Sequence, residues 1–176
     1  MTGSYTAGTD VVDAAELARL HAERDRIRSV YLHARDERPP SRARGVHHVA
    51  LICGDVERTT RFYQEVLGFP LTTMFENRDL KGSTHFFFDL GSGNTIAFFD
   101  LPGVDPGEYS EVLGGLHHLA ISIEAEHWKQ AKGRLDHHGV PYDHVDETSL
   151  YFRGPDGERL ELIADPLRWM YGERVD

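Results

Sequence analysis

The chain has 176 residues, of which 40% are hydrophobic, 10% aromatic and 27% charged. These proportions are ordinary for a soluble globular protein, and a chain of this length can bury a core without disulfide bonds. The 19 basic and 29 acidic residues give a net charge of −10, which argues against a nucleic-acid partner and, more weakly, against a highly anionic substrate. No stretch approaches the ~20 apolar residues of a membrane span, so we expect neither membrane insertion nor a signal peptide.

Cys53 is the single cysteine of the sequence. An intrachain disulfide is therefore excluded, and a reducing, cytoplasmic location is the natural expectation.

The N-terminal part, residues 1–44, is predicted to be a frayed tail over residues 1–9 followed by a helical arm over about 10–37. One stripe of the predicted helix carries Leu17, Leu20, Arg24, Ile27 and Tyr31, spaced by three and four residues. Two prolines after the helix end it. The narrow stripe favours an arm that packs on the main domain or on a second subunit, and a plain surface helix fits it equally well.

An internal repeat organises the rest of the chain. The segment Gly45–Leu51, GVHHVAL, recurs 70 residues later as GLHHLAI. A helical pattern follows each copy, over Asp55–Leu67 and Ala125–Leu135, and each ends on a glycine with a proline two residues later. Asp55 suits the N-cap of the first helix.

Three short strands are predicted after each helix, so that each half is strand, helix and three strands. We name the halves module one (residues 45–101) and module two (residues 115–166), together a domain over 45–166, with 167–176 as a C-terminal tail. Aligning the ends of the modules places Ala97 over Glu161. The predicted strands are Leu71–Glu76, Thr84–Leu90 and Thr95–Asp100 in module one, and Tyr142–Val145, Ser149–Arg153 and Arg159–Ala164 in module two.

Histidine pairs occupy the same place in both copies of the repeat, at 47–48 and 117–118. With 11 histidines a doubled histidine is weak evidence by itself, and a third pair occurs at 137–138. The equivalent positions of the first two pairs are more informative. Neighbours on a strand face opposite ways, so one histidine of each pair can face a cleft.

Glu161 lies within the last strand, where an apolar residue would be expected. A buried carboxylate is costly unless it is paired or binds a metal. Two imidazoles and one carboxylate form the set that suits non-haem Fe(II), and Mn(II) or Zn(II) can also occupy it. The alternative is that the histidines bond to backbone and that Glu161 pairs with Arg159 or Arg153.

At these residues the chain resembles the vicinal oxygen chelate superfamily, which includes glyoxalase I, fosfomycin-resistance transferases, bleomycin-resistance proteins and extradiol ring-cleaving dioxygenases. The resemblance implies an α+β fold in which two paired βαβββ modules form a curved mixed sheet around a metal site. It implies His48, His118 and Glu161 as metal ligands, with His47 and His117 facing outward. The motifs that carry it are His48–Leu51, Arg61–Phe69, His118–Ile121 and Gly154–Leu162.

Members of this superfamily with four protein ligands have a glutamate where this chain has Ala97. Three ligands are typical of the extradiol dioxygenases, which use iron, and of the fosfomycin transferases, which use manganese. The run from His144 through Tyr151 to Glu161 is similar to the extradiol signature and departs from it at Gly154 and Tyr142.

The resemblance therefore implies an Fe(II)-dependent dioxygenase that acts on a small aromatic, catechol-like substrate with O₂. Mn(II) and Zn(II) are the alternative metals. We expect a homodimer whose metal site forms within one chain or between modules of two chains. His144 is the first candidate for orienting or protonating the oxygen intermediate, and Tyr151 for hydrogen-bonding the substrate oxygen. His85, which the repeat aligns with Ser149, is a candidate acid/base.

The sequence is compatible with two other functions. One is a Mn(II)-dependent thiol transferase or another glyoxalase-type lyase or isomerase. The absence of lysine and arginine from Asp100–Gly114 counts against the transferase, which usually has a basic loop. The other is a drug-binding resistance protein, against which the complete set of three candidate ligands argues.

Overall fold

A computed structural model describes residues 12–43, 45–164, 169–170 and 173–174. These residues fall into two compact units, 12–43 and the part from Gly45 onward. The predicted tail over residues 1–9 lies outside the described residues. Of the predicted C-terminal tail, only two short paired strands are described, β9 (Trp169–Met170) and β10 (Glu173–Arg174).

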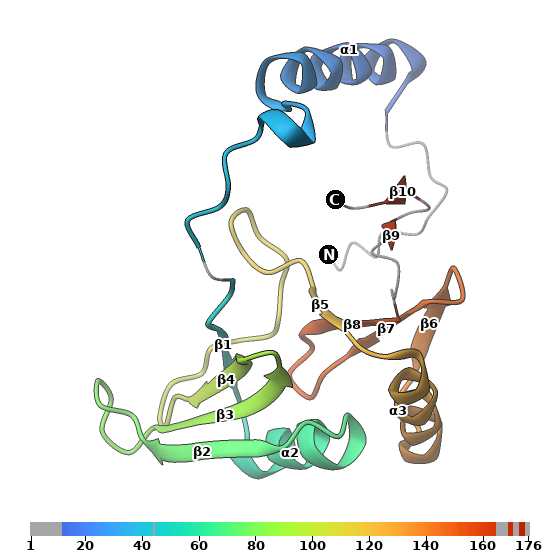
Figure 1. Cartoon of the computed structure of the whole chain (residues 1–176). Helices are drawn as coiled ribbons and strands as arrows, with labels where there is room; N and C mark the ends of the chain where they lie inside the picture. The colour runs from blue at the N-terminus through green and yellow to red at the C-terminus, as the bar shows by residue number, and fades with distance from the viewer. Residues whose placement is uncertain (1–11, 44, 165–168, 171–172, 175–176) are drawn as a thin grey trace. The chain divides into compact units, whose positions relative to one another are not determined.

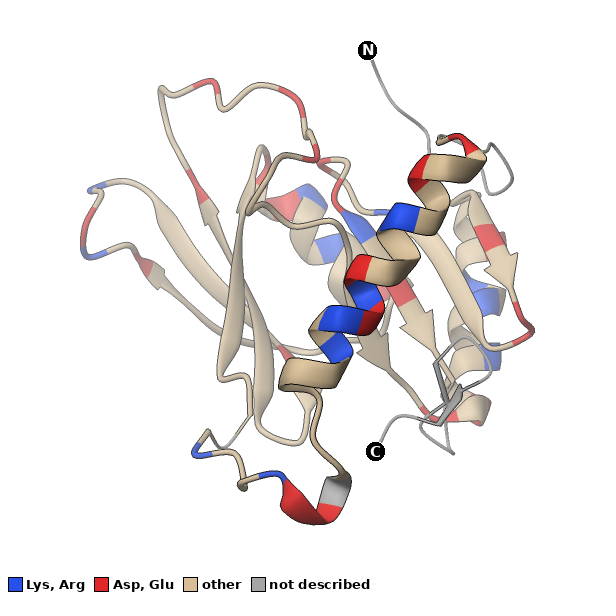
Figure 2. Cartoon of the chain, turned by 90° about the horizontal axis from the view of Figure 1, so that it is seen from above, with Lys and Arg blue, Asp and Glu red and all other residues tan. Residues whose placement is uncertain are grey.

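The first unit contains helix α1 (Ala14–Tyr31) and a 3₁₀ turn, η1 (Arg35–Glu37). Asp13 caps α1 by accepting a hydrogen bond from the Glu16 amide, so the helix begins later than the predicted residue 10. It also ends earlier than the predicted residue 37, with Leu32 as its C-cap. Acidic and basic residues alternate along it (Figure 2), and none of its residues is buried. The predicted apolar stripe is therefore exposed in this unit. Among the described residues, no helix has the length and apolar character that a membrane span requires.

Module one contains a four-stranded mixed sheet in the order β1-β4-β3-β2 (Figure 1). Strands β1 and β4 are parallel, and the other neighbours are antiparallel. The helix after β1 has a regular turn capped by Asp55, as predicted, and then widens into a π-helical turn. The elements are β1 (His48–Cys53), α2 (Val56–Arg61), η2 (Phe62–Val66), β2 (Leu71–Glu76), β3 (Thr84–Gly91) and β4 (Asn94–Asp100).

Module two repeats this topology with the strand order β5-β8-β7-β6. Its helix ends at Gly139, which adopts the left-handed conformation (φ 66°) expected of a glycine C-cap. The elements are β5 (Leu119–Ser122), α3 (Ala125–His138), β6 (Tyr142–Val145), β7 (Ser149–Arg153) and β8 (Arg159–Ile163). Two four-stranded mixed sheets with their helices confirm the predicted α+β class.

The strand registers confirm the predicted alignment of the two modules. Ala50 of β1 pairs with Ala97, and Ala120 of β5 pairs with Glu161. Phe87 lies opposite Ala97 just as Tyr151 lies opposite Glu161. The same alignment places His85 and Ser149 at equivalent positions, because each pairs with the residue two places after Ala97 or Glu161.

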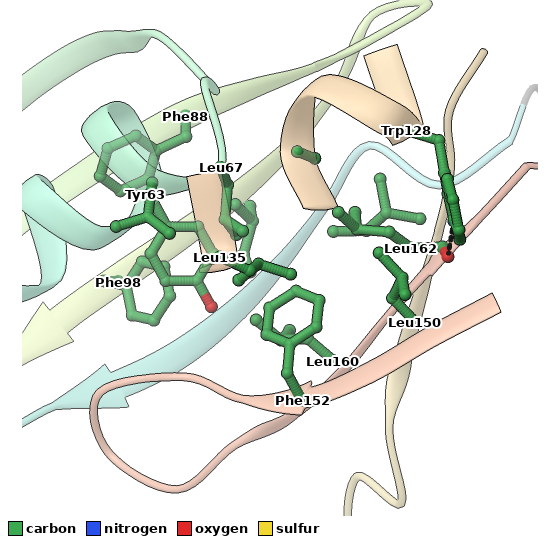
Figure 3. Packing of buried hydrophobic residues seen from close by; sticks show 14 of the residues in the cluster. Tyr63, Leu67, Phe88, Phe98, Trp128, Leu135, Leu150, Phe152, Leu160 and Leu162 are labelled. Carbon is green, nitrogen blue, oxygen red and sulfur yellow. Dashed lines mark hydrogen bonds between the residues drawn. The ribbon is translucent and has the colours of Figure 1, made fainter. Parts of the chain in front are cut away.

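One face of each sheet packs on helices and forms the core. Tyr63 of η2 lies against Phe88 and Phe98, with ring centroids 5.3 and 4.8 Å away. In module two, Trp128 of α3 donates a hydrogen bond to the Leu162 carbonyl (Figure 3). The buried apolar residues of both modules belong to one cluster, and we call the opposite face of each sheet its open face.

Polar contacts also join the two modules within the chain. The Tyr63 hydroxyl donates a buried 2.9 Å hydrogen bond to Glu158, in the turn between β7 and β8. In the same turn, Asp156 accepts hydrogen bonds from the Gly54 amide and the Arg58 guanidinium. A β-carbon at Gly154 would lie only 2.0 Å from the Glu158 carboxylate, which explains why glycine replaces the larger residue that the extradiol signature has there.

Candidate metal centre

Strand β8 places the Glu161 carboxylate on the open face of module two, next to His118. The side chain is buried, since the residue is only 5% exposed. Its Oε1 accepts a 2.6 Å hydrogen bond from the Ser149 hydroxyl, and its Oε2 lies 3.3 Å from Nε2 of His118. Glu161 therefore pairs with a histidine and a serine, and the alternative pairing with Arg159 or Arg153 is not observed.

The donor set of His118 and Glu161 fits a divalent metal. Ligand bonds of about 2.1 Å at roughly 90–105° from one another hold two donor atoms about 3.0–3.4 Å apart. The observed separation of 3.3 Å lies in this range. Ser149 fixes the carboxylate orientation in the way that outer hydrogen bonds fix metal ligands in general.

His117 stands beside this pair without joining it. Its Nδ1 lies 2.7 Å from Nδ1 of His118, and its Nε2 faces Glu111 and Arg159. A contact between the two Nδ1 atoms leaves the Nε2 atom of His118 directed toward Glu161. His47 and His48 repeat the arrangement in module one, with 2.8 Å between their Nδ1 atoms.

His48 lies on the open face of module one, where its ring is 5.9 Å from that of Phe87. The corresponding pair in module two is His118 and Tyr151, 5.7 Å apart. Across residues 12–43 and 45–164, no three histidine, cysteine, aspartate or glutamate side chains converge to hold a metal. A single chain thus brings two of the three predicted ligands together and leaves His48 apart from them.

His85 also lies on the open face of module one, among aromatic rings. It stacks on Phe99 with ring centroids 3.8 Å apart, and Phe75 and Phe87 lie beside it. Its Nε2 atom is buried and has no hydrogen-bond partner among the described residues. Burial and the nearby His48 ring lower the pKa of His85, so its imidazole favours the neutral form.

His144 lies on the other face of its sheet. It pairs in register with the buried Leu150, and its ring lies 5.3 Å from that of Trp128 in helix α3. His118, Tyr151 and Glu161 belong to the open face. The structure therefore separates His144 from the residues with which the sequence signature grouped it.

Arg159 has a different neighbour from the Glu161 carboxylate that the sequence offered it. Its guanidinium instead lies over the ring of Tyr151, 5.3 Å from the centroid. A signal was available in the sequence, because residues two apart on a strand share a face and Arg159 precedes Glu161 by two.

The chain matches the model of the Glyoxalase/Bleomycin resistance protein/Dioxygenase superfamily over residues 45–162. The chain belongs to this superfamily. The match spans both modules and confirms the family resemblance that the histidine and glutamate motifs indicated.

Curated relatives within the superfamily have more than one named activity. The chain is 29% identical over 140 residues to "Putative ring-cleaving dioxygenase MhqO" of Bacillus subtilis, a match that covers 73% of the chain and 44% of the relative. It is also 29% identical over 126 residues to lactoylglutathione lyase of Haemophilus influenzae, covering 67% of the chain and 90% of the relative. The chain thus spans less than half the length of MhqO.

Solved structures agree with this assignment. A dioxygenase-like protein from Bacillus subtilis has a TM-score of 0.59 and 28% identity, covering 68% of this chain and 40% of that chain. A mutant of the fosfomycin resistance protein FosX from Listeria monocytogenes, in complex with Mn(II) and 1S,2S-dihydroxypropylphosphonic acid, has a TM-score of 0.53 and 25% identity. That match covers 72% of this chain and 96% of FosX. A divalent metal is therefore present in at least one structural relative.

Proposed function

We propose that the protein is an Fe(II)-dependent extradiol-type dioxygenase that cleaves a catechol-like aromatic, or a related vicinal-oxygen compound, with O₂. The observation that carries the proposal is the buried Glu161 carboxylate, 3.3 Å from His118 and held by Ser149. Ala97 stands where a fourth ligand would lie. Three protein ligands leave positions for two substrate oxygens and for O₂.

We further propose that His48 reaches this site from a second copy of the chain. His118 and Glu161 lack a third ligand within the described part of their own chain, while His48 stands on an exposed sheet face. That open face also carries exposed apolar residues, including Ile52 (48% exposed) and Phe75 (47%). A two-fold dimer that covers both open faces would form two equivalent sites, each with ligands from both chains.

Bound iron would supply Lewis-acid activation of the diol oxygens and a binding position for O₂. The chain's own groups would bind and orient the substrate. Ser149 holds the Glu161 carboxylate in one orientation through its hydrogen bond. Tyr151, whose ring lies against His118, would donate a hydrogen bond from its hydroxyl to a substrate oxygen.

His85 is the candidate proton acceptor for the diol. It shares the open face of module one with His48, so a partner that supplies His48 would bring His85 to the same site. Its lowered pKa favours the neutral imidazole, which is the form that can accept a proton. The aromatic rings around it, Phe75, Phe87 and Phe99, would provide an apolar wall for an aromatic substrate. His144 has no role in this proposal, because it faces helix α3.

A Mn(II)-dependent transferase or another glyoxalase-type activity is the second candidate. The Mn(II)-bound FosX and the lactoylglutathione lyase relatives support it. A thiol transferase would use a thiol and an electrophilic substrate and would consume no O₂, so oxygen uptake separates it from a dioxygenase.

The test is oxygen consumption by anaerobically Fe(II)-loaded protein with a panel of catechols, together with the absorbance of the yellow ring-fission product. We expect turnover by the wild type and its loss in His118→Ala. His137→Ala is the matched control, because His137 belongs to a histidine pair on helix α3. No uptake with any catechol, alongside Mn(II)-dependent thiol transfer, would favour the second candidate.

A further inference from the structure

Two arginines lie opposite each other on the open face of module two. Arg153 and Arg159 are register partners in the antiparallel pair of β7 and β8. Like charges at directly opposed positions destabilise a sheet. This positive pair occurs in a protein whose net charge is −10.

The two arginines differ in how their hydrogen-bond donors are used. Arg153 donates a 2.8 Å hydrogen bond to the Gly157 carbonyl, and its guanidinium lies over the ring of Tyr109. Arg153 therefore stabilises the β7–β8 turn.

Arg159 has weaker partners. Its nearest carboxylate is Glu111, 3.9 Å away in the segment between the modules, and its Nη1 lies 3.5 Å from Nε2 of His117. Among the described residues, no carboxylate makes the close, forked contact that a guanidinium favours. Arg159 thus presents donors to an anion that would displace Glu111.

Arg159 lies within reach of a ligand bound at the candidate metal centre. It precedes Glu161 by two residues on the same strand face, a separation of about 7 Å between Cα atoms. Its guanidinium covers Tyr151, whose ring in turn contacts that of His118. A ligand with two vicinal oxygens on the metal would extend across Tyr151 toward Arg159.

We propose that Arg159 binds a carboxylate on the substrate, which makes a carboxylated catechol the preferred substrate class. This inference rests on the proposed function, since it assumes that the diol binds at His118 and Glu161. Glu111 holds the guanidinium in the free protein and is displaced when the substrate carboxylate forms a forked pair with Arg159. The net negative charge of the chain disfavours an anionic substrate in general, and Arg159 supplies a positive group beside the candidate site.

The test compares 3,4-dihydroxybenzoate with catechol, which differ by one carboxylate. Calorimetric titration of anaerobic, Fe(II)-loaded protein gives both dissociation constants. In Arg159→Gln we expect binding of 3,4-dihydroxybenzoate to weaken tenfold or more while that of catechol changes less than twofold. In Glu111→Gln we expect 3,4-dihydroxybenzoate to bind severalfold more tightly. Arg61→Gln, which removes an equal charge from an exposed helix pair, should change neither constant.

Equally weakened binding of both ligands in Arg159→Gln, or unchanged binding of 3,4-dihydroxybenzoate, would overturn the inference. If the wild type binds neither 3,4-dihydroxybenzoate nor catechol, the proposed function fails. A second measurement then tests the inference about Arg159 by itself. Benzoate is titrated into metal-free protein labelled with [¹⁵N]arginine. A saturable shift of the Arg159 Nε–H signal, absent with benzyl alcohol, supports a carboxylate site, and no shift refutes it.

Discussion

The hydroxyl of Tyr63 and the carboxylate of Glu158 meet in a 2.9 Å hydrogen bond that joins the helix of module one to the β7–β8 turn of module two. Tyr63 is fully buried, and Glu158 is 5% exposed. The turn that this bond holds leads directly into the strand that carries Glu161. The contact therefore links the packing of the two modules to the position of a candidate metal ligand.

Removing this hydroxyl should destabilise the protein. In Tyr63→Phe the Oε1 atom of Glu158 loses this donor inside the core, while Oε2 keeps the Asp156 amide. An unsatisfied buried acceptor costs about 1–3 kcal/mol. Urea unfolding of the variant should show a loss of that size. Tyr142→Phe is the control, because its hydroxyl bonds to the exposed Asp136, and it should lose much less. Equal losses in the two variants would contradict the role given to Tyr63.

Glu158 should also impose a pH dependence on stability. Burial is the main cause that raises the pKa of this carboxyl above its ordinary value, so the folded protein holds the proton more tightly than the unfolded chain. Its contribution to stability is present below the unfolded pKa and is lost as pH rises through the folded pKa. The free energy of unfolding of Glu158→Gln, relative to wild type, should therefore rise as the pH increases above about 4. A difference that stays constant with pH would refute this assignment.

Cys53 should resist thiol reagents in the folded protein. Burial raises its pKa to about 11, so about one molecule in a thousand carries a thiolate at pH 8. Native protein should react with a chromogenic disulfide far more slowly than protein unfolded in guanidinium, which should release one equivalent. Rapid reaction of the native protein would show that Cys53 is accessible.

Ser149 should tune the affinity for metal. Its hydroxyl orients the Glu161 carboxylate at 2.6 Å, and loss of such an outer hydrogen bond typically weakens metal binding about 10–100-fold. Ser149→Ala should show this loss in competition with a chromogenic chelator. Ser122→Ala, an exposed serine on β5, is the control and should bind as wild type does. Unchanged metal affinity in Ser149→Ala would contradict this role of Ser149.

The repeat made much of the fold predictable from sequence. Because both modules keep the same spacing from strand to strand, the equivalence of Ala97 with Glu161 and of His85 with Ser149 could be read before the registers were known. The family resemblance then supplied the topology. The buried pairing of Glu161 with His118 follows from this topology together with the alternation of a strand.

Other features depend on information that periodicity does not contain. The face occupied by His144 is set by the turn after β6, where Asp146 and Glu147 adopt positive φ and fix His144 opposite Leu150. A change of one residue in that turn would place His144 on the open face. Helix α1 begins later than predicted because Asp13 caps it, and exposed charged pairs rather than a buried stripe lie along it. Whether modules of one chain or of two complete a site is also not encoded in local sequence.

Mixed dimers test most directly whether His48 of one chain joins His118 and Glu161 of another. His48→Ala and Glu161→Ala should each abolish high-affinity metal binding alone. If sites form between two chains, equal amounts refolded together should restore about one quarter of the wild-type sites, because half of the dimers are mixed and each has one intact site. Mixed dimers, verified with two affinity tags, that recover no metal binding would contradict the claim.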